Sequence, residues 1–287
     1  MIKSHDVGIG LRPAYYNDLI DGKAPVDWLE IVSEDYFPKG GLEVAALERI
    51  RAHYPVVMHG VGLSLGSADP LNWNYLHALK RLEERLQPAW VSDHICWTGI
   101  DGWVSHDLLP LPRTQKVLDH LIARVHVVQE FLGRPLVLEN VTQYLDYKHN
   151  DFSEGVFLSL LSEATGCSFL LDINNSYVNG INRSLDPWES LSDFPWKAVR
   201  QYHVAGHEVS DSGLLLDTHR SPLSESVCDL MVKAWHQQPA AILLERDDHM
   251  PDLAILWQEA LSLKKRLNSK ETDEHKRSAT SVEGVTV

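Results

Sequence analysis

The chain has 287 residues, of which 44% are hydrophobic and 23% charged, and its formal net charge is −14. This composition is typical of a globular protein with a sizeable buried core. The charge disfavours a nucleic-acid partner, because phosphate binding requires clustered Lys and Arg, and no apolar stretch approaches the roughly 18 residues of a membrane-spanning helix.

Cysteine usage and the N-terminal segment indicate the compartment. Cys96, Cys167 and Cys228 form neither a CxxC pair nor a zinc-ribbon spacing, and the N-terminal segment lacks the long apolar core of a secretory signal. We therefore expect a reduced, cytoplasmic protein that has no membrane association.

Short apolar segments alternate with amphipathic segments along the chain, which is the pattern of a parallel α/β fold. Most of these segments are almost continuously apolar, as expected for strands that are buried on both faces. The expected strands are residues 6–12, 28–34, 55–61, 89–97, 135–141, 168–177, 199–206 and 240–246. Eight strands favour a single-domain (β/α)8 TIM barrel over residues 1–268, although an open doubly wound sheet has the same alternation.

Helices are expected between the strands. Residues 114–132 place apolar side chains on one face and end at Gly133, a common helix terminator. Residues 222–237 would begin with Ser221 as N-cap and Pro222 in the first helical position. Further helices are expected at residues 42–53, 70–87, 154–164 and 252–267, with a short helix at 187–195. Residues 269–287 are polar and aperiodic, which predicts a disordered tail.

The third to eighth expected strands each carry a potential metal ligand at or near the C-terminal end. In a barrel these ends converge at one mouth, where catalytic groups lie. The six residues are His59, His94, Glu139, Asp172, His203 and Glu245, and the second strand adds Glu30 and Glu34 as weaker candidates.

Each of these residues alone could be structural, as a hydrogen-bonded histidine, a helix cap or a partner of arginine. Three carboxylates at one mouth, however, are costly to bury unless cations neutralise them. Arg12 and Arg246 are the main cationic side chains nearby in the sequence. We therefore predict a metal site, and imidazole ligands without thiolates favour iron, zinc or manganese.

A second group of polar residues follows the seventh expected strand. It consists of His207, Glu208, Asp217 and His219. Together with Asn175, Asp217 and His219 could hold a further metal above the same mouth. The alternative is ordinary hydrogen bonding within a loop.

Six motifs also occur in the order of one known family. They are HGVGLSLGSADPLN (59–72), SDHICW (92–97) followed by HDLLPLPRT (106–114), LENVTQY (138–144), LLDINNSYVN (170–179), YHVAGH (202–207) and LLERD (243–247). The chain from Gly8 to Leu267 thereby resembles the multinuclear non-heme iron-dependent oxidases, which include the oxidase of methanobactin maturation and were long catalogued as uncharacterised.

The resemblance implies a TIM barrel of the xylose-isomerase and apurinic-endonuclease type that holds two or three iron ions. One iron would be held by His59, His94 and a bridging Glu139, and the second by Glu139, Asp172, His203 and Glu245. Asn175, Asp217 and His219 would form the third site. The methanobactin-type oxidase has His where this chain has Asn175, which puts occupancy of the third site in question.

The resemblance also implies an activity, namely dioxygen-dependent oxidation of cysteine residues in a ribosomally made precursor peptide that a partner protein presents. One iron would hold the substrate thiolate, a ferrous neighbour would react with dioxygen, and hydrogen would leave the cysteine β-carbon. Glu139, His94 and Asp172 are the expected catalytic residues. Supporting contacts, or simple strand-end hydrogen bonds, are expected from His106, Asn140, Asn174 and Arg246.

Two other functions fit the same residues. A redox-silent metal hydrolase or isomerase could use these ligands to activate water or shift a hydride. A barrel that stores metal or holds a partner without turnover is the other alternative.

Overall fold

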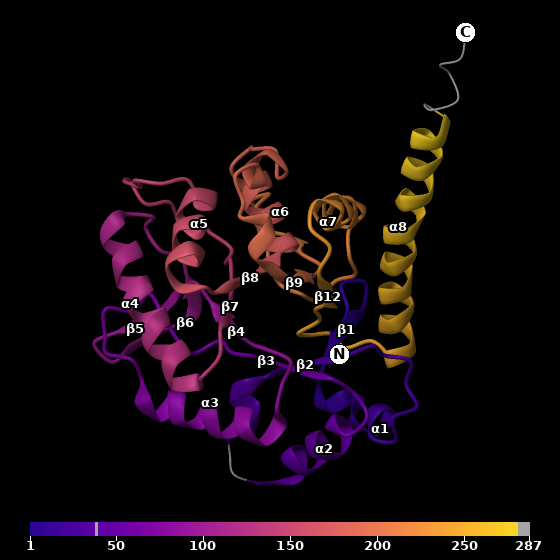
Figure 1. Cartoon of the computed structure of the whole chain (residues 1–287), viewed down its shortest axis with the longest axis horizontal. Helices are drawn as coiled ribbons and strands as arrows, with labels where there is room; N and C mark the ends of the chain where they lie inside the picture. Colours follow the sequence, from indigo (N-terminus) through magenta and orange to yellow (C-terminus); the bar gives the residue numbers. More distant parts are fainter. Residues whose placement is uncertain (38–39, 281–287) are drawn as a thin grey trace.

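The computed structural model describes residues 1–37 and 40–280, with side chains as far as Leu267. Eight parallel strands close into a barrel in the order β1-β12-β9-β8-β7-β4-β3-β2, and helices surround it (Figure 1). The barrel strands are β1 (Val7–Gly10), β2 (Leu29–Val32), β3 (Val56–His59), β4 (Val91–His94), β7 (Leu136–Glu139), β8 (Ser168–Asp172), β9 (Val199–Val204) and β12 (Ala241–Leu244). The predicted single TIM barrel is confirmed, and each expected strand segment contains one barrel strand.

The outer layer consists of helices that follow the strands. The longer ones are α2 (Leu42–Arg51), α3 (Trp73–Leu86), α4 (Gln115–Leu132), α5 (Glu154–Thr165), α6 (Ile173–Asn182), α7 (Glu225–Gln237) and α8 (Leu253–Thr280). Short elements are α1 (Tyr16–Leu19) and the 3-10 turns Pro13–Tyr15, Ser33–Tyr36, Glu189–Leu191 and Trp196–Ala198. Helix α4 ends as predicted, at Gly133 with φ of 73°.

Two predicted boundaries are wrong because a different residue caps the helix. The expected strand 168–177 ends at Asp172, because the Asp172 side chain accepts the N–H of Asn175 and starts α6 there, which is the role of an N-cap. Helix α7 begins after Ser224, whose hydroxyl accepts the N–H of Val227. The hydroxyl of Ser221, the expected cap, instead donates to a loop carbonyl at His207.

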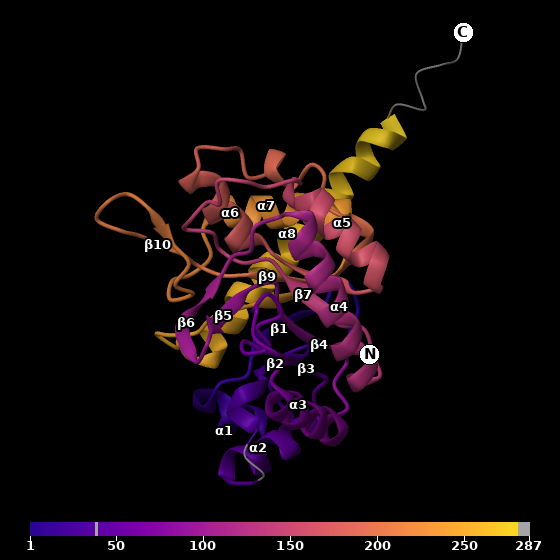
Figure 2. The same cartoon turned by 90° about the vertical axis from the view of Figure 1, so that its left-hand side faces the viewer.

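Two antiparallel hairpins were not predicted. The first is β5 (Trp97–Ile100) with β6 (Trp103–Leu109), and the second is β10 (Glu208–Val209) with β11 (Leu215–Leu216). They follow the C-terminal ends of β4 and β9, and they project from the same side of the barrel (Figure 2). Both hairpins therefore flank the predicted catalytic mouth.

Helix α8 runs beyond residue 267, where the apolar periodicity predicted its end, and reaches Thr280. Lys, Glu and Arg are frequent after residue 267 and are good helix formers without an apolar face. Residues 281–287 lie outside the described residues, and the expected disordered tail of residues 269–287 stays a prediction. Among the helices of the described residues, none is long and apolar enough to cross a membrane.

The barrel interior is layered, and this layering positions the polar residues. Successive side chains of a strand point to opposite faces, so residues two apart share the interior face. An apolar layer fills the lower interior with Trp28, Val57, Trp90, Val137, Leu170, Ala241 and Leu243. Val57, Val137, Leu170 and Leu243 each lie two residues before a predicted ligand. The pleat therefore places those ligands inside the barrel, above an apolar floor.

Candidate metal centre

All six predicted strand-end ligands come together at the C-terminal mouth and are buried, with exposed fractions between 0% and 9%. Their ligand atoms fall into groups in which every atom lies within 4.8 Å of the others. The groups are His59 with His94 and Glu139, Glu139 with Asp172 and His203, and Asp172 with His219 and Glu245. Glu139 and Asp172 are each shared by two groups, so the three groups form one continuous cluster.

The first group is built around one carboxylate oxygen. Nε2 of His59 lies 3.3 Å from Oε2 of Glu139, and Nε2 of His94 lies 3.1 Å from the same oxygen. The two imidazole rings are in edge contact, with centroids 4.7 Å apart. Three potential ligand atoms thus converge on one point.

The opposite ring nitrogens indicate which atoms carry protons. Nδ1 of His94 lies 3.1 Å from the carbonyl oxygen of Gly60, which can only accept a hydrogen bond. Nδ1 of His59 lies 2.8 Å from the Ser92 hydroxyl, which itself donates to the carbonyl of Met58. In the neutral imidazoles both protons are therefore on Nδ1, and both Nε2 atoms present lone pairs to Glu139.

The second group continues from the other oxygen of Glu139. Nδ1 of His203 lies 3.3 Å from Oε1 of Glu139 and 3.0 Å from Oε2 of Glu245. Asp172 supplies the third side chain of this group, and its Oδ1 accepts a hydrogen bond from the N–H of Asn175 at 2.6 Å. Its other oxygen remains available to a ligand at the centre of the group.

Several of these buried atoms lack a hydrogen-bond partner among the residues that the structure describes. They are Oε2 of Glu139, Oδ2 of Asp172, Oε2 of Glu245 and both ring nitrogens of His203. Unpartnered buried polar atoms are destabilising, and each requires an explanation. Carboxylate oxygens and imidazole nitrogens that converge without partners fit divalent or trivalent metal ions.

The pKa shifts of the buried carboxylates in the metal-free cluster also favour a bound cation. Burial raises the pKa of Asp172 well above its usual value, and the charges of Asp217 and Glu139 raise it further. Burial also opposes ionisation of Glu139, but His94 and His203 hold its pKa well below the usual value. Protons shared among these groups offset part of the negative charge, and a bound metal would displace them.

The residues predicted for a third site are only partly brought together. Nε2 of His219 lies 2.7 Å from Oδ1 of Asp217, and Nδ1 lies 2.8 Å from Oδ2 of Asp247. The Thr142 hydroxyl contacts the side-chain oxygen of Asn175 and lies 3.0 Å from Oδ2 of Asp217. The side chain of Asn175 is therefore linked to Asp217 through the Thr142 hydroxyl. His219 instead lies beside Asp172 and Glu245.

A cavity of about 220 Å³ opens above the cluster. Its walls include His94, Glu139, Asn175, Asp217, His219 and Glu245, together with Asp107 and Leu108 of β6 and Thr142 and Tyr144 after β7. The β5–β6 hairpin, which the sequence did not reveal, therefore forms part of the entrance to the cluster.

Two of the predicted supporting residues lie against the ligands. The Asn140 side chain accepts the N–H of Asp172 at 2.8 Å and donates to its carbonyl at 3.1 Å, which fixes the end of β8. The Asn174 amide donates to Oδ1 of Asp217 at 2.6 Å, and its oxygen lies 2.8 Å from Nδ1 of His207. Both asparagines therefore orient elements that carry ligand candidates.

Other candidates lie away from the cluster. Arg246 is buried but turns toward Glu259, at 3.1 Å, on α8, and His106 is exposed on β6. Glu34 accepts the N–H groups of Val61 and Gly62, so it is occupied by the loop after β3. These three predicted residues do not reach the ligand atoms.

Two further residues of the site were undervalued or missed in the sequence. Oε1 of Glu30 lies 2.9 Å from Nε2 of His203, although Glu30 was ranked below the strand-end residues. The carboxylate of Asp247 contacts Nδ1 of His219 through one oxygen and the guanidinium of Arg12 through the other. Both residues could have been found from the two-residue period of strand side chains. Glu30 lies two residues after Trp28, and Asp247 lies two residues after Glu245, on the same face in each case.

Comparison with known proteins supplies the family context. A sequence model of the family described as RiPP precursor modification enzyme MbnB/TglH/ChrH matches residues 6–268. A UPF0276 protein of Caulobacter vibrioides is 42% identical over 254 residues, covering 88% of this chain and 90% of that protein. A UPF0276 protein of Acaryochloris marina is 43% identical with coverage of 88% and 91%.

Solved structures resemble the chain in fold alone, because their sequence identity is low. A xylose isomerase-like TIM barrel protein from Mycobacterium smegmatis in complex with magnesium has a TM-score of 0.58 at 12% identity, covering 94% of this chain and 99% of that one. Endonuclease IV from Thermus thermophilus has a TM-score of 0.57 at 13% identity, with coverage of 93% and 99%.

Proposed function

The chain belongs to the MbnB/TglH/ChrH family of RiPP precursor modification enzymes, and from this membership we propose that it is an iron-dependent oxidase. Its substrate would be a cysteine residue of a ribosomally synthesised precursor peptide, with dioxygen as co-substrate. A partner protein would present the peptide at the mouth of the barrel.

The continuous cluster is the observation that carries the proposal. A chemistry with several irons requires ions close enough to act on one substrate, and carboxylates shared between neighbouring groups provide that proximity. In the proposed assignment His59, His94 and Glu139 hold one iron, and Glu139, Asp172, His203 and Glu245 hold the second. Asp217, His219 and Asn175 would complete a third, weaker site, because an amide oxygen is a poorer ligand than imidazole.

Iron bound here would supply the redox chemistry with dioxygen, while the protein supplies binding, orientation and exclusion of water. The Nδ1 contacts of His59 and His94 keep both Nε2 atoms aimed at Glu139. A cavity of about 220 Å³ admits one side chain with a few waters rather than a folded domain. This size supports an extended peptide segment that inserts a single cysteine.

The test is anaerobic purification with ferrous iron, metal analysis, and dioxygen uptake with a Cys-containing precursor peptide and a candidate partner protein, both sought among the neighbouring genes. We expect two or three irons per chain and an oxygen-dependent change in peptide mass. A matched peptide with Cys→Ser should give neither uptake nor a mass change.

Zinc at every site, with no iron and no dioxygen consumption, would overturn the proposal. Turnover with zinc or manganese under strict anaerobiosis would instead favour the redox-silent hydrolase or isomerase class. Full cellular function of a Glu139→Gln variant that has lost its metal would favour a non-catalytic scaffold.

A further inference from the structure

The cavity above the metal cluster has a buried inner wall and an exposed outer wall. The inner wall includes His94, Glu139 and Asn175, whose exposed fractions are 2% to 6%. The outer wall includes Tyr144, which is 50% exposed, and the exposed Asp107. A cysteine side chain that reaches the inner wall therefore leaves its own peptide backbone beside Tyr144 and Asp107.

The hydroxyl of Tyr144 is fixed in place and keeps one hydrogen available. It accepts the backbone N–H of Asp217 at 2.8 Å, which joins the loop after β7 to the loop after β9. A tyrosine hydroxyl can accept and donate at the same time. Among the residues that the structure describes, this hydroxyl donates to none. Its hydrogen is therefore available to a molecule in the cavity.

Asp107 offers the opposite polarity on the β6 side of the cavity. Its Oδ1 accepts the backbone N–H of Leu108 at 2.8 Å. Within the described part of the chain its other oxygen contacts no donor and the carboxylate has no ion pair. An ionised carboxylate can only accept hydrogen bonds. Asp107 therefore presents a free acceptor where Tyr144 presents a free donor.

The backbone of the β5–β6 hairpin is irregular next to Asp107. The pairing register shifts between Trp97 and Gly99, and β6 contributes extra residues there. One of these residues, His106, has a φ of 55°, which is uncommon for a residue with a side chain. Bulges of this kind redirect side chains and are frequent beside active sites. The irregularity thus accounts for Asp107 lining the cavity from an exposed hairpin.

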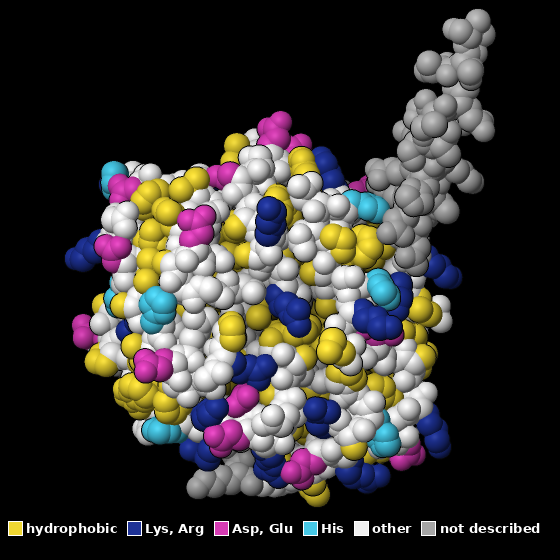
Figure 3. Space-filling model, viewed as in Figure 1, with side chains coloured by type: hydrophobic (Ala, Val, Ile, Leu, Met, Phe, Trp, Pro, Cys, Tyr) yellow, Lys and Arg dark blue, Asp and Glu magenta, His cyan; other side chains and the backbone are white. Residues whose placement is uncertain are grey.

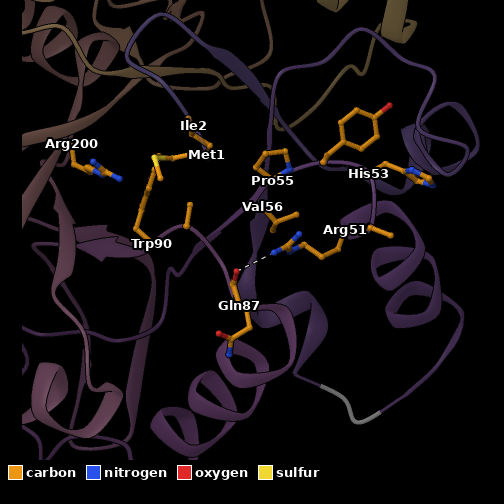
Figure 4. Close-up of a pocket in the computed structure, with 12 residues that line it drawn as sticks. Met1, Ile2, Arg51, His53, Pro55, Val56, Gln87, Trp90 and Arg200 are labelled. Atoms are coloured by element: carbon orange, nitrogen blue, oxygen red, sulfur yellow. Dashed lines mark hydrogen bonds between the residues drawn. The ribbon is translucent and has the colours of Figure 1, made fainter.

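A pocket at the opposite end of the barrel is not a route to the cluster. Figure 4 shows this pocket of about 550 Å³, with Arg51, Arg200 and Trp90 in its walls. Val56 begins β3 and Trp90 precedes β4 there, whereas the ligand candidates lie at the C-terminal strand ends. The apolar floor lies between the two. A cysteine that reaches the cluster therefore enters past Tyr144 and Asp107.

We propose that Tyr144 and Asp107 form a backbone clamp around the substrate cysteine. The Tyr144 hydroxyl donates to a backbone carbonyl of the peptide, and the Asp107 carboxylate accepts a backbone N–H. Peptide bonds offer these two groups whatever the side chains are, so the clamp selects an amide-linked cysteine rather than a particular neighbour. The inference rests on the proposed function in taking a cysteine thiol to bind at the cluster, and it requires neither iron nor dioxygen.

The test compares two thiols on the cobalt(II)-loaded protein, in which cobalt–thiolate absorption reports binding. N-acetyl-L-cysteine N-methylamide has an amide on both sides of the cysteine, whereas ethanethiol has the thiol without a backbone. The ratio of the ethanethiol Kd to the capped-cysteine Kd measures the preference for the backbone. Changes in metal geometry or local charge act on both thiols and cancel when this ratio is compared between variants.

Tyr144→Phe removes the donor of the clamp. We expect the backbone preference to fall about 2–10-fold, which corresponds to the loss of one neutral hydrogen bond. Tyr147→Phe is the matched control on the same loop. The Tyr147 hydroxyl donates to the carbonyl of Pro110 at 2.9 Å and does not line the cavity, so its removal should leave the preference unchanged.

Asp107→Ala removes the acceptor of the clamp. The backbone preference should again fall about 2–10-fold, because the carboxylate is exposed and solvent screens its charge. Asp211→Ala is the control for the loss of one negative charge near the mouth, since Asp211 is exposed in the β10–β11 hairpin and does not line the cavity. Circular dichroism and cobalt content verify that each variant is folded and loaded.

The proposal is overturned if both thiols bind and the backbone preference is the same in Tyr144→Phe, Asp107→Ala and the parent protein. It is also overturned if the two control variants lower the preference equally. Absence of thiolate absorption with either thiol would contradict thiol binding at the cluster and the clamp with it. A clamp that behaves as expected in a protein that neither holds iron nor consumes dioxygen would contradict the proposed function alone.

Discussion

Glu139 is the residue on which the two main groups of the cluster depend. Its Oε2 faces His59 and His94, and its Oε1 faces His203. In the proposed assignment Glu139 would couple two ions, because any movement of a shared carboxylate changes both coordination shells. Removing its charge should therefore affect both sites at once.

Glu139→Gln should lower the affinity of both main sites by at least about 10–100-fold, since losing a ligand costs no less than losing a residue that orients one. Metal content after anaerobic reconstitution and dialysis measures the loss. Glu83→Gln is the control, because it neutralises a buried carboxylate that pairs with Lys80 and Arg134 and is not a ligand candidate. Two tightly bound irons in the Glu139→Gln protein would refute the bridging role.

Asn175 offers a second test at the scale of a single side chain. Imidazole binds iron and zinc more tightly than an amide oxygen does, so Asn175→His should strengthen a third metal site formed with Asp217 and His219. Iron titration monitored by Mössbauer spectroscopy would report the additional ion. If Asn175→His and Asn175→Ala give identical stoichiometry, residue 175 is not a ligand.

Much of the site was predictable from single residues, because the strand-end ligands follow a period of two along buried strands. Glu30 and Asp247 obey the same period, but their partners are distant in sequence, 173 and 28 residues away at His203 and His219. Pairings over such separations leave no local pattern in the chain. The periodicity therefore predicted which faces are polar, but not which polar groups touch.

At the scale of elements, the loop after β9 places His219. The N–H of His219 donates to the carbonyl of Gly206 at 3.0 Å, and the loop returns so closely that a Cβ on Gly206 would lie 2.0 Å from the carbonyl oxygen of Ser221. Glycine is required here because backbone, rather than a flexible side chain, occupies the space.

Gly206→Ala should displace this loop and destabilise the protein by about 1–3 kcal/mol, the usual range for overpacking. Metal held by His219 should be lost before metal held by His59 and His94. Thermal unfolding and metal titration measure the two effects. Gly40→Ala is the control, since a Cβ there meets nothing within 4 Å. Equal metal binding in both variants would show that Gly206 does not position His219.

The elements themselves were predictable to different degrees. The barrel strands were recognisable because burial on both faces makes them apolar. Residues 173–177 directly follow the apolar segment 168–171 and were predicted as part of the same strand, although three of them are polar. The Asp172 cap instead starts α6 there. The hairpins β5–β6 and β10–β11 escaped prediction because they are not buried strands of the barrel. Their apolar side chains remain exposed, as Trp103 and Val209 illustrate at 56% and 68% exposure.

For the whole molecule, metal binding and stability should be linked. On the face shown in Figure 3, positively charged Lys and Arg are interspersed with negatively charged Asp and Glu. The buried cluster is different, because the carboxylates of Glu139, Asp172 and Glu245 gather at one mouth of the barrel. A metal ion that offsets their charge binds the folded state alone. Such a ligand stabilises that state by about 2.7 kcal/mol at 100 times its Kd.

Removing metal with a chelator should lower the Tm by about 5–10 °C per tight site, given about 2–4 °C per kcal/mol for a protein of this size. Binding should also weaken as the pH falls, because protons compete for the same carboxylates and imidazoles. Differential scanning calorimetry with and without chelator measures the shift. An unchanged Tm would show that the cluster folds equally well without metal.

The most direct test of the central claim is an anomalous difference map, collected at the iron edge from crystals grown anaerobically with ferrous iron. We expect at least two adjacent peaks, one among His59, His94 and Glu139 and another among Glu139, Asp172 and His203. A single peak, peaks only at the zinc edge, or peaks away from Glu139 would contradict a two-iron centre bridged by this carboxylate.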